Sequence, residues 1–217
     1  MSFNNSNFPH KMKIVLATHN LDKCVEMEAI MKDMPIQLLT LNEFPEIEEI
    51  IEDGETLEEN ALIKAKTVHN ITHLPAIADD TGLEVDALGG QPGIYSARYA
   101  GENCSYSDNI NKLLKEMVNI PTKKRSAFFR TAIAYVDKNM EHATEGVVEG
   151  IIIDMMKGID GFGYDPVFYI PSMKKTYAEM SMNEKNQISH RGKAVKNMQI
   201  LLQARLPNLF QQMEDIS

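Results

Sequence analysis

Residues 12–40, MKIVLATHNLDKCVEMEAIMKDMPIQLLT, carry the strand–helix–strand pattern that decides the fold class. The apolar, β-branched run 12–18 predicts a strand, and the run 36–40 predicts a second one. Between them, apolar residues recur at helical spacing until Pro35: Cys24, Met27, Ile30, Met31 and Met34. Later, the β-rich runs 126–136 and 144–154 flank Asp137-Lys138-Asn139, which is a hairpin signal. Strand–helix alternation followed by a hairpin predicts an α/β fold with a mixed central β-sheet flanked by helices.

The composition is that of a globular protein, with 217 residues of which 43% are hydrophobic and 24% are charged. We expect a polar N-terminal tail over residues 1–11 and one folded domain over 12–217. No apolar run approaches the roughly 20 residues of a membrane helix, and the start lacks a signal-peptide core, so we expect a cytoplasmic protein without a membrane partner. The net charge of −9 argues against a polymeric nucleic acid partner but leaves a small nucleotide open.

The stretch 78–101, ADDTGLEVDALGGQPGIYSARYAG, places two carboxylates after a predicted buried strand at 74–78. Thr81-Gly82 predicts a turn at the end of that strand. Ligands of open α/β sheets bind beyond the carboxyl ends of strands, so Asp79 and Asp80 are candidate metal ligands. Ordinary turn chemistry explains the same residues, and both interpretations stay open here.

A second candidate is the turn that joins the first strand to the first helix. A helix N-terminus favours an anion such as phosphate, and Lys23 adds a full positive charge. The residues concerned are Thr18, His19, Asn20, Leu21, Asp22 and Lys23. The alternative is a plain Asn cap followed by a solvated lysine.

Two further segments carry polar groups next to glycine or a helix start. In the loop 161–166, GFGYDP, Phe162 can stack on a flat heterocycle and Asp165 can accept a hydrogen from a ring N–H, unless Phe162 is core and Asp165 belongs to a turn. The run 183–193, NEKNQISHRGK, by itself indicates a solvated cap before a terminal helix at 193–206. Thr56 and Glu59 form a capping box that begins another helix.

Taken in order, five blocks resemble the inosine triphosphate pyrophosphatase family, in particular its bacterial branch. They are VLATHNLDK, GETLEENALIKA, ADDTGLEVDALGGQPGIYSARYAG, GFGYDPVF and KNQISHRGKA. The resemblance covers nearly the whole chain from Lys13 to the last helix. His19 and Thr81 depart from the usual Thr-Gly-Asn turn and Asp-Asp-Ser block of that branch. The resemblance implies hydrolysis of ITP, dITP and XTP to the monophosphate and pyrophosphate, a nucleotide site in the cleft between two lobes, and a homodimer.

The same resemblance implies roles for individual residues. Asp80 is the expected general base and metal-linked carboxylate, Glu52 its partner metal ligand, and Lys64 a catalytic lysine. The turn 18–23 and Thr81 are expected at the phosphates. The residues expected around the base and phosphates are Phe162, Gly163, Tyr164, Asp165, Lys185, His190 and Arg191. A pair of carboxylates with substrate phosphates suits Mg²⁺ better than any His/Cys centre.

Three other functions remain possible on sequence grounds. A pyrophosphatase for pyrimidine or other modified nucleotides is disfavoured by the Ser-His-Arg run at 189–191 and by the GFGYDP loop. A catalytically silent nucleotide-binding protein is disfavoured by the presence of both Glu52 and Asp80. An interaction protein with an acidic surface would show no magnesium-dependent thermal shift with ITP.

Overall fold

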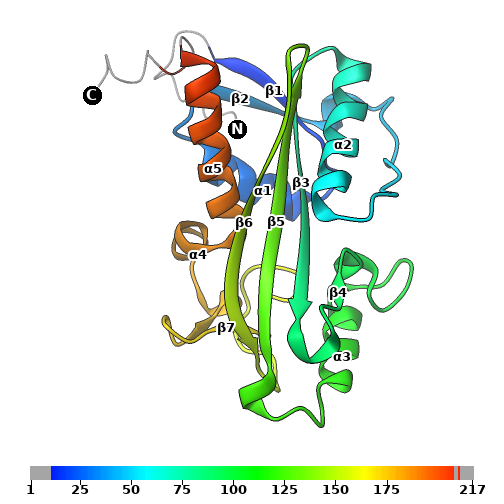
Figure 1. Cartoon of the computed structure of the whole chain (residues 1–217), viewed down its shortest axis with the longest axis vertical. Helices are drawn as coiled ribbons and strands as arrows, with labels where there is room; N and C mark the ends of the chain where they lie inside the picture. Colours follow the sequence, from blue (N-terminus) through cyan, green and yellow to red (C-terminus); the bar gives the residue numbers. More distant parts are fainter. Residues whose placement is uncertain (1–10, 208–209, 211–217) are drawn as a thin grey trace.

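The computed structural model describes residues 11–207 and residue 210, and these fold around one long β-sheet (Figure 1). Within them the strands are β1 (Met12–Leu16), β2 (Ile36–Thr40), β3 (Ala76–Val85), β4 (Pro92–Gly93), β5 (Ser126–Asp137), β6 (Met140–Ile152), β7 (Phe168–Ile170) and β8 (Lys175–Thr176). The α-helices are α1 (Leu21–Met31), α2 (Leu57–Thr72), α3 (Tyr106–Glu116), α4 (Met182–Ile188) and α5 (His190–Arg205). The predicted tail falls mostly on residues 1–10, outside the described residues, and the single domain over 12–217 stays a prediction.

The sheet is mixed, as predicted. Its order is β2-β1-β3-β5-β6-β7-β8, with β4 paired to β3 beside this path. β1 runs parallel to β2 and β3, whereas β3, β5 and β6 pair antiparallel. Asp137 pairs with Met140, so the hairpin turn is Lys138-Asn139, and β6 begins earlier than the predicted Thr144 because its register with β5 continues to the turn.

Helices cover both faces of the sheet. Alternation along β1 sends Ile14 and Leu16 into the core formed with α1 and α5, and sends Val15 into the core formed with α2, which Ala17, just after the strand, also joins. Helix α2 begins at the predicted capping box, in which Thr56 Oγ1 accepts from the backbone N–H of Glu59 at 3.1 Å. Its predicted stripe is buried: Leu57, Ala61, Ala65 and Val68.

β3, β5 and β6 extend past these helices into a second lobe, in the lower half of Figure 1. This lobe has its own buried cluster, to which α3, the ends of the long strands and β7 contribute. Leu83, Leu113, Phe129 and Phe168 are among its members. The two clusters of the first lobe and the separate cluster of the second confirm the predicted two-lobed α/β architecture. Among the described helices, none has the length and apolar character needed to span a membrane.

The predicted turn at Thr81-Gly82 is wrong. β3 continues through both residues, with Gly82 opposite Arg130 of β5. A Cβ at Gly82 would lie 2.6 Å from the carbonyl oxygen of Gly93, so this glycine serves a close approach of two backbones. The two carboxylates at 79 and 80 therefore lie within a strand and not beyond its end.

The predicted solvated cap at 183–193 is also wrong. This run forms α4 and the start of α5, which begins at His190 and not at Lys193. Lys185, His190 and Arg191 are only 3%, 2% and 1% exposed. Their polar character comes from ion pairs and contacts inside the protein, which local sequence does not report.

Candidate active site

A cavity of about 500 Å³ takes its walls from both lobes and collects most of the predicted site residues. The predicted residues that line it are Thr18, His19, Asn20, Lys23, Glu52, Lys64, Asp80, Thr81, Phe162, Gly163, Tyr164, Asp165, Lys185, His190 and Arg191. Leu21 and Asp22 do not line it, and Leu21 is 68% exposed. The turn after β1 and the start of α5 are far apart in the sequence, yet both line this cavity.

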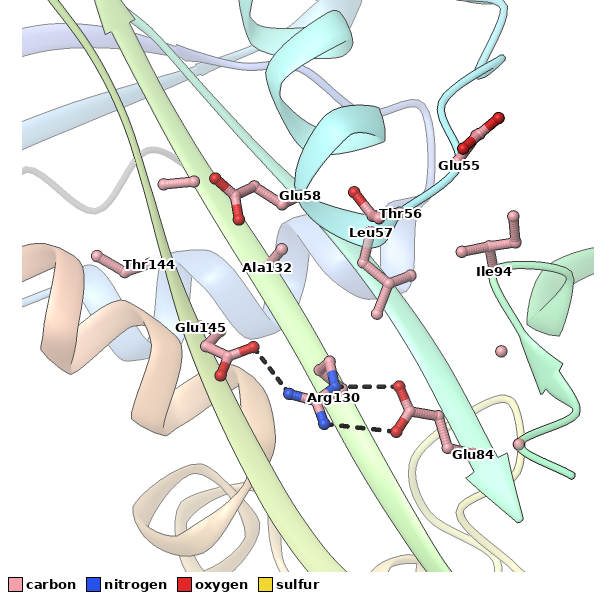
Figure 2. Close-up of a pocket in the computed structure, with 13 residues that line it drawn as sticks. Glu55, Thr56, Leu57, Glu58, Glu84, Ile94, Arg130, Ala132, Thr144 and Glu145 are labelled. Carbon is pink, nitrogen blue, oxygen red and sulfur yellow. Dashed lines mark hydrogen bonds and ion pairs between the residues drawn. The ribbon is translucent and has the colours of Figure 1, made fainter. Parts of the chain in front are cut away.

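A second cavity, of about 530 Å³, lies near the N-terminus of α2 and is rich in carboxylates (Figure 2). Arg130 lines this cavity, and its guanidinium already donates from Nε to Glu84 Oε1 at 3.0 Å and from Nη1 to Glu145 Oε2 at 2.8 Å. Glu55 and Glu58 line it as well. A highly anionic ligand would be repelled here, because the lining holds more negative than positive charge. We therefore assign the candidate active site to the first cavity.

One wall of the candidate active site holds two carboxylates that meet at a lysine. Lys64 Nζ lies 3.1 Å from Glu52 Oε1 and 3.2 Å from Asp80 Oδ1. Asn60, one turn earlier on α2, donates from Nδ2 to Asp80 Oδ2 at 3.3 Å. Burial acts to lower the pKa of Lys64, but Asp80 and Glu52 outweigh it and raise that pKa. Lys64 is therefore a fixed positive charge beside both carboxylates.

These carboxylates fit a metal that is shared with a substrate. Among residues 11–207 and 210, no three His, Cys, Asp or Glu side chains gather into a group that could hold a metal ion. Mg²⁺ is commonly bound through one or two carboxylates, with substrate phosphates and water as the other ligands. Glu52 and Asp80 converge on one cation, the ammonium of Lys64, and so suit such a partial site.

The turn before α1 forms the next part of the wall. Asn20 caps the helix, because its Oδ1 accepts from the backbone N–H of Lys23 at 3.1 Å. Thr18 Oγ1 accepts from the backbone N–H of Asn20 at 3.1 Å, which fixes the turn. The predicted Asn cap is confirmed, but Lys23 is not a solvated lysine: Nζ lies 3.2 Å from Asp79 Oδ2, and the side chain is 16% exposed. The positive end of the α1 dipole and Lys23 thus adjoin the same cavity.

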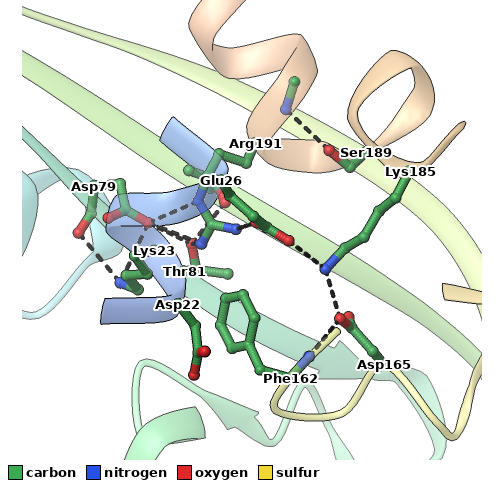
Figure 3. Close-up of polar contacts among 12 residues, drawn as sticks. Asp22, Lys23, Glu26, Asp79, Thr81, Phe162, Asp165, Lys185, Ser189 and Arg191 are labelled. Carbon is green, nitrogen blue, oxygen red and sulfur yellow. Dashed lines mark hydrogen bonds and ion pairs between the residues drawn. The ribbon is translucent and has the colours of Figure 1, made fainter. Parts of the chain in front are cut away.

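A chain of alternating charges joins this turn to the loop 161–166 (Figure 3). Each member forms an ion pair with the next: Lys23, Asp79, Arg191, Glu26, Lys185 and Asp165. All except Lys23 are buried. Because a buried ion is costly unless it is paired, the arrangement specifies how α1, β3, α4, α5 and the loop fit together.

At the β3 end of this chain, Asp79 receives several donors on one oxygen. Arg191 Nη2 and Nε lie 2.9 Å and 3.2 Å from Asp79 Oδ2, and Thr81 Oγ1 donates to the same atom at 3.1 Å. Burial alone would raise the pKa of Asp79, but Lys23 and Arg191 hold it far below its usual range. Asp79 is fully buried and does not line the cavity, so it positions the two cations.

At the loop end, Lys185 lies between two buried carboxylates. Its Nζ is 2.6 Å from Glu26 Oε1 and 2.5 Å from Asp165 Oδ2. Glu26 also pairs with Arg191 Nη1. Asp165 accepts from the backbone N–H of Phe162 at 2.9 Å, and burial raises its pKa despite Lys185. Asp165 therefore closes the loop as well as lining the cavity.

The loop conformation depends on Gly161. Its φ is +73°, and a Cβ there would lie 2.1 Å from Asp165 Oδ2. The neighbouring Phe162 is half-buried, with Lys185 Nζ 5.0 Å from its ring centroid. Phe162 is thus part of the cavity wall and is not a core residue.

His190 is held as a neutral ring by its surroundings. It stacks on Phe129 with centroids 4.5 Å apart and planes at 11°. Burial, followed by the charges of Arg191 and Lys185, holds the pKa of His190 well below its usual value. The close approach of α5 to β6 requires Gly146, because a Cβ there would lie 2.2 Å from the His190 carbonyl oxygen.

Sequence reasoning missed Glu26 and Tyr106, and it assigned no role to Asp79 once the resemblance had been named. Glu26 lies next to Met27 on the buried face of α1. An acidic residue on a predicted buried face is a signal that a cation pairs with it inside the protein. Tyr106 follows the cap residue Ser105 on α3 and carries no local signal of its contact with the distant turn.

The fold and the cavity together define an α/β protein whose two lobes line one cavity with cations, carboxylates and an aromatic ring. The chain belongs to the Ham1 family, whose model matches residues 14–200. It is similar to a dITP/XTP pyrophosphatase of Caldanaerobacter subterraneus subsp. tengcongensis, with 46% identity over 196 residues that cover 90% of this chain and 98% of the relative. A dITP/XTP pyrophosphatase of Geobacter sulfurreducens is 48% identical over 184 residues, covering 84% of this chain and 92% of the relative.

A solved structure supports the same family. The fold is similar to that of a HAM1 protein from Coxiella burnetii, with a TM-score of 0.80, 41% sequence identity, and coverage of 89% of this chain and 99% of that chain. The resemblance stated from the sequence blocks is confirmed by the family match.

Proposed function

We propose that this protein hydrolyses non-standard purine nucleoside triphosphates, namely ITP, dITP and XTP, to the monophosphate and pyrophosphate. The observation that carries this proposal is that one cavity is lined by residues 18–20 and Lys23 of the turn before α1, by the carboxylates Glu52 and Asp80, and by the ring of Phe162. In this proposal the turn adjoins the phosphates of the nucleotide, the two carboxylates hold the metal ion, and the ring of Phe162 contacts the purine base. The names of the two relatives support the same activity.

In this reaction the oxygen of water bonds to the α-phosphorus, and the bond from that phosphorus to the oxygen bridging to the β-phosphate breaks. Asp80 accepts a hydrogen bond from the attacking water, orients it and takes up the proton that the water loses, because it is the carboxylate that lines the cavity from β3. Lys64, 3.2 Å from Asp80, and Lys23 at the helix N-terminus stabilise negative charge on the phosphates. Lys185 is enclosed by Glu26 and Asp165, so we assign it to the base end of the cavity.

We propose Mg²⁺ as the cofactor, held by Glu52 and Asp80 together with the substrate's phosphates. When bound, the ion supplies positive charge that offsets the charge of the phosphates. The protein contributes the two carboxylates, and Asn60 and Lys64 fix the orientation of Asp80.

For base choice, we propose that Asp165 and His190 recognise the N1–H and the C6 oxygen of an oxo purine. Both line the cavity that Phe162 also lines, and a neutral His190 has one ring N–H to donate. Arg191 is a poorer candidate for the C6 oxygen, because its guanidinium already donates to Asp79, Glu26 and Thr81. Adenine has neither the N1–H nor the C6 oxygen, and a site built on such hydrogen bonds rejects it.

The test is pyrophosphate release by the purified protein with Mg²⁺, comparing ITP, dITP, XTP, GTP and ATP at equal concentrations. Preferential release from the first three supports the reaction and the base recognition together. Release of orthophosphate in place of pyrophosphate would contradict the bond assignment, and equal rates on ATP would contradict the base recognition. The homodimer stays a prediction, which light scattering of the same preparation tests.

A further inference from the structure

Tyr106 connects α3, in the second lobe, to the turn at 18–23 in the first lobe. Its hydroxyl donates to Asp22 Oδ2 at 2.9 Å and accepts from Asn20 Nδ2 at 3.2 Å. Its ring also lies 5.9 Å, centroid to centroid, from the ring of Phe162. One side chain thus contacts the helix cap of the turn, the acidic residue of the turn and the aromatic wall.

The contact with Asp22 matters because Asp22 is an acidic residue in the turn that we propose binds the phosphates. Asp22 is exposed and does not line the cavity, although Asn20 and Lys23 on either side of it do. In Figure 3 its carboxylate points away from Lys23, toward the side where Phe162 lies. A carboxylate free to turn back toward the cavity would repel a triphosphate and compete for Lys23.

The hydroxyl of Tyr106 is suited to hold this carboxylate. Burial, together with the hydrogen bond to Asp22, raises the pKa of Tyr106 even though Asn20 opposes the rise. The phenol therefore stays protonated near neutral pH and can donate. A hydrogen bond to a charged acceptor is among the stronger kinds, and a ring fixed against Phe162 loses little freedom in making it.

We propose that Tyr106 is a positioning residue that keeps the Asp22 carboxylate away from the part of the cavity next to Lys23, where the proposed triphosphate would lie. This inference rests on the proposed function, because it requires a triphosphate at the turn 18–23. It assigns Tyr106 to substrate affinity and not to the chemical step.

The experiment is Tyr106→Phe, which keeps the ring and removes the hydroxyl. We expect the KM for ITP and its Kd from calorimetry to rise about 3- to 10-fold, with kcat within about twofold of wild type. The rise should shrink at high salt, because it arises from repulsion between charges near the surface. In an Asp22→Asn background the same substitution should raise neither constant, because the repelling charge is gone.

Tyr169→Phe is the matched control, because Tyr169 lies on β7 and does not line the cavity. A rise in Kd that persists in the Asp22→Asn background, or no rise at all, overturns the proposal. The proposed function fails separately: a wild type that binds ITP without releasing pyrophosphate contradicts the hydrolysis, while the Kd values still decide the role of Tyr106. A wild type that does not bind ITP overturns both.

Discussion

Asp79 and Asp80 are neighbours in β3, yet they face opposite sides of the sheet and have opposite surroundings. Asp79 is fully buried against α1 and α5, where Lys23, Arg191 and Thr81 donate to it or pair with it. Asp80 faces α2 and lines the cavity with Lys64 and Glu52 nearby. Because strand side chains alternate, two adjacent carboxylates can serve separate purposes: one orders the cations of the site, and the other faces the substrate.

The largest expected effect is on turnover, from a change on the cavity face. Asp80→Asn keeps the shape of the side chain and removes its charge, so it should lower the kcat of pyrophosphate release at least about 100-fold. The loss of stability should be smaller than for Asp79→Asn, because Lys64 keeps its ion pair with Glu52, and calorimetry should still detect ITP. A variant with near-normal kcat would show that Asp80 does not orient the water.

The same substitution on the other face tests the contrast directly. Asp79→Asn removes the charge that pairs with Arg191 and Lys23, and breaking a buried ion pair in this way costs about 3 kcal/mol or more. Denaturant unfolding should therefore show a large loss of stability, in contrast to Asp80→Asn. Equal stability of the two variants would remove the distinction between the faces.

A third prediction concerns the neutral His190 on the Asp79 side. Its folded pKa lies well below the usual value because of burial, followed by Arg191 and Lys185. Below about pH 6.5 the unfolded chain binds a proton that the folded protein does not, so stability is lost progressively as pH falls from 7 to 5. His190→Asn should flatten the dependence of unfolding free energy on pH between 7 and 5. His142→Asn, at an exposed position, is the control and should leave the slope unchanged.

The smallest effect on stability and activity is expected at the second cavity, which β3 lines on the same face as Asp80. Glu84 lies there with Arg130 and Glu145, in the second cavity. Glu145 is 62% exposed, so Glu145→Gln should cost at most about 1 kcal/mol of stability and leave ITP hydrolysis unchanged. A large loss of activity would show that the second cavity, and not only the first, takes part in the reaction.

Local patterns predicted the parts of the fold that depend on nearby residues. The capping box at Thr56 and Glu59, the stripe on α2, the strand at 36–40 and the hairpin at Lys138-Asn139 formed as predicted. Each depends on contacts within a few residues or on a simple alternation. The prediction of a turn at Thr81-Gly82 was wrong. Gly82 is a glycine because the backbone of Gly93 packs against it, and the local pattern does not contain that contact.

At the candidate site, too, some residues could be predicted from the sequence and others could not. Of the site residues that the blocks of sequence named, all except Leu21 and Asp22 line the cavity, but other residues such as Ser96 and Arg98 line it as well. The blocks did not reveal Glu26, which pairs with Arg191 across 165 positions, or Tyr106, which bonds to Asp22 across 84. A polar run such as 183–193 looks solvated until its partners are known, and here those partners are buried carboxylates.

The sequence by itself determined the mixed α/β class, the main helices and strands, and part of the set of residues at the candidate site, because periodicity, capping and motif blocks are local properties. The tertiary structure alone decided which face each carboxylate of β3 occupies, which cations pair with it, and which residues at the turn lie outside the cavity. Those outcomes depend on contacts between segments far apart in the chain, since the cost of burying each charge is set by the partner that the fold brings to it.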